Sequence, residues 1–72
     1  MTTPHTAEIA VRYTAGAHVT NTINGKRASS TSSAEEAARV MCRKLFGDDA
    51  FTLVRTHIEN GREVFSAIRD QA

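Results

Sequence analysis

The segment from Ser33 to Ile68 constrains the fold most, because a capped amphipathic helix is followed directly by two strand-like runs. Ser33 stands three residues before Glu36, a spacing that lets each side chain bond to the backbone N–H of the other residue. Gly47 follows the last apolar residues and suits a left-handed C-terminal cap, which favours a residue without Cβ. The sequence therefore predicts a helix that begins after Ser33 and ends before Gly47.

The predicted helix is amphipathic. Its apolar residues recur at the i, i+3, i+4 and i+7 spacing that places them on one face, and they are Ala34, Ala37, Ala38, Met41 and Leu45. Small alanines on this face allow the helix to approach a sheet closely. Glu35 and Arg39 lie on the opposite face, four residues apart, and are expected to pair in solvent.

Strand patterns precede the helix. Apolar and polar residues alternate from Ala7 to Tyr13, so that Arg12 is expected on the face away from the core, and a second β-branched run extends from Val19 to Ile23. Asn24-Gly25 is a hairpin-turn signal, and residues 26–30 form a weak third strand. Residues 1–6 are polar, include a proline and are expected to be a flexible leader, with a single domain over 7–72.

The hairpin after the helix pairs residues 51–59 with residues 62–69 and allows two registers. A two-residue turn at Asn60-Gly61 places Glu59 opposite Arg62, whereas a three-residue loop places Ile58 opposite Arg62. We favour the second register because it collects Val54, Ile58, Val64 and Ile68 on one aliphatic face. A slip of one residue exchanges the two faces. Together the patterns predict an α+β domain, with one helix packed on one face of an antiparallel sheet of four to five strands.

Length and charge limit the possible functions. A chain of 72 residues buries only about 60% of the surface that it exposes when unfolded, which leaves little interior for an enclosed active site. The net charge of +1 argues against a strongly basic nucleic-acid binder. Cys42 is the only cysteine, and no segment resembles a signal peptide or a membrane span. We therefore expect a cytoplasmic protein without membrane association. We expect Cys42 to be a packing residue on the flank of the apolar face of the helix.

Catalytic patterns are not evident in the sequence. The three histidines and one cysteine do not follow the spacing of a zinc site, and no glycine-rich phosphate loop occurs. The serines before the helix are typical of turns and caps. We expect no enzymatic activity, no metal and no cofactor.

In the favoured register, the hairpin leaves a second sheet face that one helix cannot cover, with phenylalanine side chains among basic ones. This face is interpreted as a covered or partner-binding surface, although stacking aromatics and cations also suit single-stranded nucleic acid. The candidate partner-binding residues are Arg12, Arg27, Phe51, Arg55, His57, Phe65 and Arg69.

The layout over roughly residues 18–69, with the run Ser33 to Arg39 and the hairpin around Asn60-Gly61, resembles several small phage-encoded anti-CRISPR proteins. This resemblance carries over no individual functional residue. It implies a non-enzymatic inhibitor that binds a bacterial CRISPR surveillance complex and blocks its nucleic-acid-binding surface in the host cytoplasm. The alternatives are a small DNA- or RNA-binding module and a homodimeric accessory protein, and we expect a monomer or a homodimer.

Overall fold

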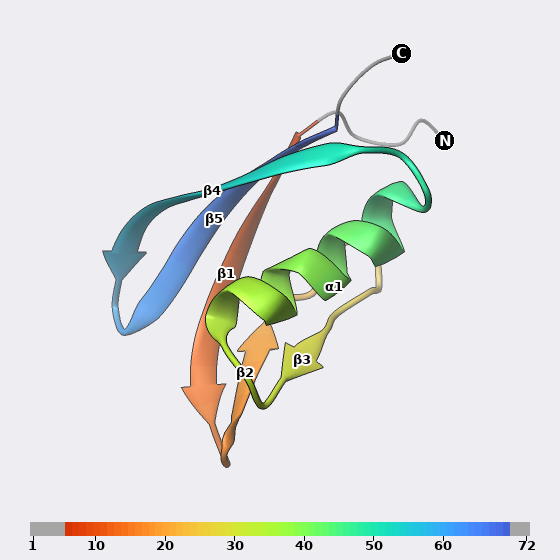
Figure 1. Cartoon of the computed structure of the whole chain (residues 1–72). Helices are drawn as coiled ribbons and strands as arrows, with labels where there is room; N and C mark the ends of the chain where they lie inside the picture. Colours follow the sequence, from red (N-terminus) through yellow and green to blue (C-terminus); the bar gives the residue numbers. More distant parts are fainter. Residues whose placement is uncertain (1–5, 70–72) are drawn as a thin grey trace.

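The computed structural model describes residues 6–69, which form a five-stranded antiparallel sheet and one helix (Figure 1). The strand order across the sheet is β3-β2-β1-β5-β4. Along the chain the elements are β1 (Thr6–Thr14), β2 (Ala17–Thr20), β3 (Ser29–Ser30), α1 (Ala34–Phe46), β4 (Phe51–Glu59) and β5 (Arg62–Arg69). The predicted α+β class and element order are therefore confirmed. The predicted leader lies outside the described residues except for Thr6, which begins β1.

Helix α1 has the predicted ends. The Ser33 hydroxyl accepts a hydrogen bond of 3.1 Å from the Glu36 N–H, so that Ser33 is the N-cap residue. Gly47 follows the last turn with φ of 65°, and its N–H donates to the Arg43 carbonyl over 2.9 Å. Within residues 6–69, no return bond joins the Glu36 carboxylate to the Ser33 N–H, so only one half of the capping box forms.

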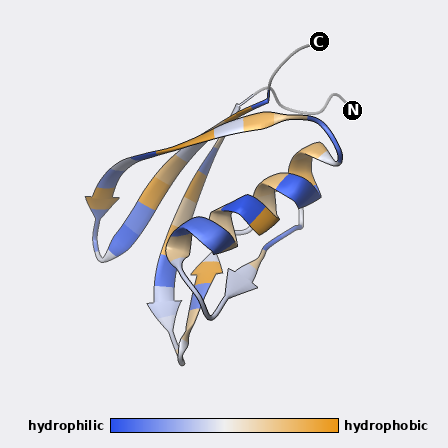
Figure 2. Ribbon diagram, in the orientation of Figure 1, coloured by the Kyte–Doolittle hydropathy of each residue, from blue (hydrophilic) through white to orange (hydrophobic). Residues whose placement is uncertain are grey.

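One helix and one face of the sheet form the core. The apolar stripe of α1 faces β1, β2 and β5, and in Figure 2 the polar residues of the helix lie on the outer side. The alanines at 34, 37 and 38 are at most 5% exposed, which brings the helix axis close to the strands. The largest side chains with essentially no exposure are Ile9, Val11, Met41 and Cys42. The core therefore lies mainly between α1 and β1.

The favoured register of the last hairpin is wrong at the turn, but the pairs that it predicts are observed from Phe51 to Arg55. Glu59 pairs with Arg62, and Asn60 and Gly61 form a two-residue turn with φ of 51° and 76°. Positive φ at both central residues is the geometry of a type I′ turn, whose twist matches that of the strands. The alternative register is thus observed next to the turn, up to the pair His57–Val64. Val54 and Ile68 do share a face, as the favoured register places them, but α1 covers the other face, on which β5 pairs Phe65 with Ile9 and leaves it 3% exposed.

Strand β4 contains a bulge. Arg55 pairs with Phe65 and His57 pairs with Val64, so that Thr56 has no cross-strand partner residue of its own. The Thr56 hydroxyl instead donates to the Val64 carbonyl over 3.1 Å. Because of the extra residue, side chains before and after the bulge follow different alternations. Arg55 therefore shares the helix-side face with Phe65, and His57 shares the opposite face with Val64.

Strand β2 covers Ala17–Thr20 and is shorter than the predicted run from Val19 to Ile23. It ends at Thr20, and Ile23 forms only an isolated bridge to Lys26 across the Asn24-Gly25 turn. Thr20 is 5% exposed on the helix side, whereas Val19 pairs with Arg12 on the opposite face. The buried hydroxyl is satisfied because it accepts from the Ala28 N–H and donates to the Asn21 carbonyl. The alternation of apolar and polar residues in the sequence does not reveal these two bonds of the Thr20 hydroxyl.

Candidate functional site: an arginine pocket on the open sheet face

The face of the sheet opposite α1 is not covered by any other element of residues 6–69 (Figure 1). We call it the open face. It has an aliphatic end near the start of β4, where Val54 is 49% exposed and Ile68 is 44% exposed. At the other end, β1 and β5 place Arg12 directly opposite Arg62. The open face therefore combines exposed aliphatic side chains with a basic end.

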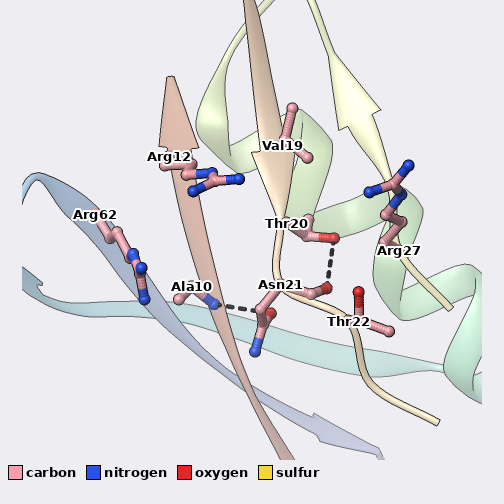
Figure 3. Close-up of a pocket in the computed structure, with 8 residues that line it drawn as sticks. All are labelled: Ala10, Arg12, Val19, Thr20, Asn21, Thr22, Arg27 and Arg62. Atoms are coloured by element: carbon pink, nitrogen blue, oxygen red, sulfur yellow. Dashed lines mark hydrogen bonds between the residues drawn. The ribbon is translucent and has the colours of Figure 1, made fainter. Parts of the chain in front are cut away.

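The basic end contains an open pocket of about 170 Å³ (Figure 3). Its arginines come from three separate parts of the chain, namely Arg12 on β1, Arg62 at the start of β5 and Arg27 between β2 and β3. We call this site the arginine pocket. No carboxylate of residues 6–69 lies within ion-pair distance of these three guanidinium groups. Glu59 is the cross-strand partner of Arg62 but forms no ion pair with it, so the pocket presents three guanidinium groups that are not engaged in ion pairs.

Asn21 organises the floor of the arginine pocket. Its backbone N–H donates to the Ala10 carbonyl over 2.9 Å, and its side-chain Oδ1 accepts from the Ala10 N–H over 3.2 Å. Its Nδ2 group donates to the Glu8 carbonyl over 3.4 Å. Figure 3 shows the Asn21 side chain reaching across to β1, with Arg12 and Arg62 on one side of it and Arg27 on the other. These bonds continue the pairing between β1 and the chain beyond the end of β2.

Arg27 is held in place by its neighbours and by the helix. The Lys44 Nζ group donates to the Arg27 carbonyl over 2.7 Å, and the Lys26 Nζ group donates to the Lys44 carbonyl over 3.0 Å. The carbonyl of the next residue, Ala28, accepts from the Thr20 N–H over 2.9 Å, and the Ala28 N–H donates to the Thr20 hydroxyl over 2.8 Å. The backbone that carries Arg27 is thus fixed between α1 and β2, while the guanidinium group remains at the surface.

The predicted partner-binding residues do not form one surface. Arg12 and Arg27 meet in the arginine pocket, and His57 lies on the open face beyond the bulge. Phe65 is buried, and Phe51 is half-buried with its ring 6.2 Å from that of Phe46. The expectation that both phenylalanines lie on an uncovered face is therefore wrong, because α1 packs on the face of the hairpin that carries them.

Three of the predicted basic residues have acidic neighbours. Arg55 lies 3.6 Å from Glu63, and Arg69 lies 3.5 Å from Asp49. The Arg69 side chain is only 18% exposed, and both arginines follow the helix-side alternation of the sheet. His57 Nε2 lies 3.9 Å from a Glu59 oxygen on the open face. These pairs leave less free positive charge around β4 than in the arginine pocket.

Arg62 was missed by the sequence reasoning. Its position follows from the turn, since a two-residue loop at Asn60-Gly61 puts Arg62 at the first paired position of β5. Pairing of β5 with β1 then brings it opposite Arg12. The long-range pairing of β1 with β5 has no local signal in the sequence, so the juxtaposition could be found only after the sheet order was known.

Cys42 lies in the core and not at a site. It is fully buried, and its burial raises the pKa of the thiol from 9.0 to about 11, against an opposing effect of the nearby Arg39 charge. A thiol of this kind is protonated at neutral pH and is a poor nucleophile. Across residues 6–69, histidine, cysteine and carboxylate side chains do not gather in a group of three that could hold a metal ion.

Helix α1 is too short and too polar to cross a membrane, and it is the sole α-helix of residues 6–69. Comparison with known protein families, with curated proteins and with solved structures found no match to this chain.

Proposed function

We propose that this chain is a non-enzymatic binding protein that docks on another protein through its open face. The observation that carries the proposal is the uncovered sheet face, on which Val54 and Ile68 are about half exposed at one end and the arginine pocket lies at the other. A surface that combines exposed aliphatic groups with arginine is typical of protein interfaces, where arginine is enriched and most other charged residues are depleted. The net charge of +1 is also in keeping with a protein partner.

The arginine pocket specifies the charge of the partner surface. Three guanidinium groups without carboxylate neighbours favour an acidic patch, because charge complementarity accelerates association and disfavours basic surfaces. A nucleic-acid-binding groove is itself cationic. The protein would therefore inhibit such a groove by docking on an acidic surface beside it and obstructing it sterically.

The resemblance to small anti-CRISPR proteins supplies the class of partner within this proposal. The chain would bind a bacterial CRISPR effector complex and block its access to nucleic acid. What supports it is the small α+β layout with one open sheet face, and the partner itself remains a prediction.

The absence of catalysis is part of the same proposal. Its support is the make-up of the arginine pocket, whose other lining groups are Ala10, Val19, Thr20, Asn21 and Thr22. None of these has a side chain that exchanges protons near neutral pH, and the buried Cys42 lies on the other side of the sheet. The pocket is suited to holding an anion and offers no general acid or base.

Direct nucleic-acid binding through stacked phenylalanines loses its structural basis. Phe65 is buried under α1, and Phe51 packs against Phe46. A nucleic-acid module would have to rely on the arginines alone. That alternative becomes an outcome of the test below.

The test measures binding of the purified protein to a panel of purified CRISPR effector complexes and to labelled DNA and RNA. We expect one of the complexes to bind, and its binding of target DNA to fall when the protein is added. Val54→Glu and Ile68→Glu should each weaken that binding by about tenfold or more, because they place charge in a desolvated interface. Ile58→Glu is the matched control, since Ile58 is 66% exposed and lies outside the aliphatic end of the open face.

Two results would contradict the proposal. One is a panel in which no complex binds while DNA or RNA is retained with a steep salt dependence, which would favour the nucleic-acid module. The other is binding that the control variant weakens as much as Val54→Glu does. Circular dichroism spectra of the three variants identify any loss of binding that comes from unfolding.

A further inference from the structure

The arrangement of Arg12 and Arg62 disfavours the fold unless something compensates their charges. They are direct partners in the antiparallel pairing of β1 with β5 and share the open face. Like charges directly opposite each other in a sheet are destabilising. The carboxylates on this face are Glu8 and Glu59. Glu59 is the β4 partner of Arg62, but its carboxylate lies 3.9 Å from His57 and forms no ion pair with either arginine. The repulsion between Arg12 and Arg62 is therefore offset only in part within the sheet.

Arg27 adds a third guanidinium group to this pair. The backbone of Arg27 is fixed by the bond from Lys44 to its carbonyl and by the bonds between Ala28 and Thr20. An ordered segment therefore carries the third guanidinium group of the pocket. Asn21 stiffens the strand between Arg27 and Arg12 through its bonds to β1. A preorganised site of this kind loses less conformational entropy when it binds a ligand.

We propose that the arginine pocket is a binding site for a phosphate dianion of the monoester type. Guanidinium groups present planar, paired N–H donors that match phosphate oxygens, and two negative charges offset the repulsion of the opposed arginines. The volume of about 170 Å³ is well above the roughly 15 Å³ needed for one water molecule, so a phosphate group with part of its hydration fits. The inference goes beyond docking on a protein, because the pocket binds phosphate whether or not the aliphatic end meets a partner.

The first experiment titrates the full chain with inorganic phosphate and follows the arginine side-chain and backbone resonances by NMR. We expect saturable shifts at Arg12, Arg27, Arg62 and Asn21 at constant ionic strength, and no saturable shifts with chloride. Arg12→Gln and Arg62→Gln should each weaken phosphate binding by about tenfold or more. Arg43→Gln removes an exposed charge of the same type from the helix and should leave the affinity unchanged.

A second measurement uses thermal unfolding to detect the repulsion itself. Without phosphate, Arg12→Gln should melt at or above the temperature of the unaltered protein, because it relieves the contact with Arg62. With phosphate, the unaltered protein should gain stability while Arg12→Gln gains little, since only a ligand of the folded state raises the melting temperature. The protein with the higher melting temperature is therefore expected to change when phosphate is added. A charge-bridging ligand produces this change, and a merely structural role of Arg12 would not.

Further titrations identify the source of the phosphate. O-phosphoserine and adenosine monophosphate carry a dianionic monoester, whereas a short oligonucleotide without terminal phosphates carries only diesters. Tighter binding of the monoesters supports the proposal. Tighter binding of the oligonucleotide, phosphate shifts that do not saturate, or an unchanged phosphate affinity in Arg62→Gln would overturn it. Neither result affects docking through Val54 and Ile68, so the two proposals fail separately.

Discussion

The N-terminus of α1 depends on a single side-chain bond. Ser33 accepts from the Glu36 N–H, while the Glu36 carboxylate makes no bond back to Ser33 in the part of the chain described. The helix also begins with two acidic residues, Glu35 and Glu36, whose charges interact favourably with the N-terminal end of the helix dipole. At this scale, the hydroxyl of Ser33 and the charge of Glu36 have separate roles.

Replacement of Ser33 by Ala should lower the free energy of unfolding by about 1 kcal/mol, because it leaves the Glu36 N–H without its acceptor. Glu36→Gln should cost less, since it removes only a charge near the helix end. Urea denaturation of both variants measures the difference. Ser32→Ala is the control, because the Ser32 hydroxyl makes no bond within residues 6–69. Equal stability of Ser33→Ala and Ser32→Ala would show that the cap does not stabilise α1.

The turn of the β4–β5 hairpin and the bulge in β4 together decide which residues of the two strands face each other. Asn60 and Gly61 both have positive φ, and the two-residue loop that they form sets Glu59 opposite Arg62. That loop makes Arg62 the first paired residue of β5, where β1 brings it opposite Arg12. Phe65 lies beyond the bulge and packs under α1 because β5 pairs it with Ile9. The backbone preference of the turn therefore helps to place the candidate site, whereas the core side of the hairpin follows from long-range pairing.

Substitution of Gly61 by Val should destabilise the domain by more than about 1 kcal/mol, because a β-branched residue resists a φ of 76°. Asn60→Asp should have a much smaller effect, since aspartate also tolerates the left-handed region. Chemical denaturation of both proteins gives the comparison. Similar losses for the two substitutions would contradict the type I′ geometry of the turn.

Local features of this fold were predictable and long-range ones were not. The cap at Ser33, the end of α1 at Gly47 and the turn at Asn60-Gly61 follow from residue types at fixed spacings. The faces of the strands did not, because the burial of Thr20 depends on a bond from Ala28, and the alternation of β4 changes at its bulge. Two of the three arginines of the arginine pocket, Arg12 and Arg27, were predicted as partner-binding residues. Arg62 could be added only once the pairing of β1 with β5 was known.

At the scale of the whole molecule, a thin core between one helix and one sheet face contains an ionisable group. Cys42 is fully buried, and burial raises the pKa of its thiol to about 11. In the unfolded chain the thiol titrates near 9.0, so the unfolded state loses its proton at lower pH than the folded state does. The folded protein therefore loses stability as the pH rises above about 9.

Between pH 9 and 11, the free energy of unfolding should fall by up to about 2 kcal/mol more in the unaltered protein than in Cys42→Ala. Lysine and tyrosine side chains titrate in both proteins, so their effects cancel in the difference. Denaturant unfolding at several alkaline pH values measures how the free energy of unfolding of each protein changes with pH. Cys42→Ala also loses stability because its core side chain is smaller, but that loss is the same at every pH and does not alter the slope. Parallel slopes would mean that the thiol titrates alike in the folded and unfolded states.

The bulge in β4 also bears on self-association. β4 is the outermost strand beside β5, so one row of its backbone N–H and carbonyl groups is not paired within the sheet. Such a row is a template on which another extended chain can add, and bulges and charged side chains are common protections against it. Here the shift in register falls after Arg55, and His57 and Glu59 follow it. Uninterrupted addition of a foreign strand is therefore confined to the stretch from Phe51 to Arg55.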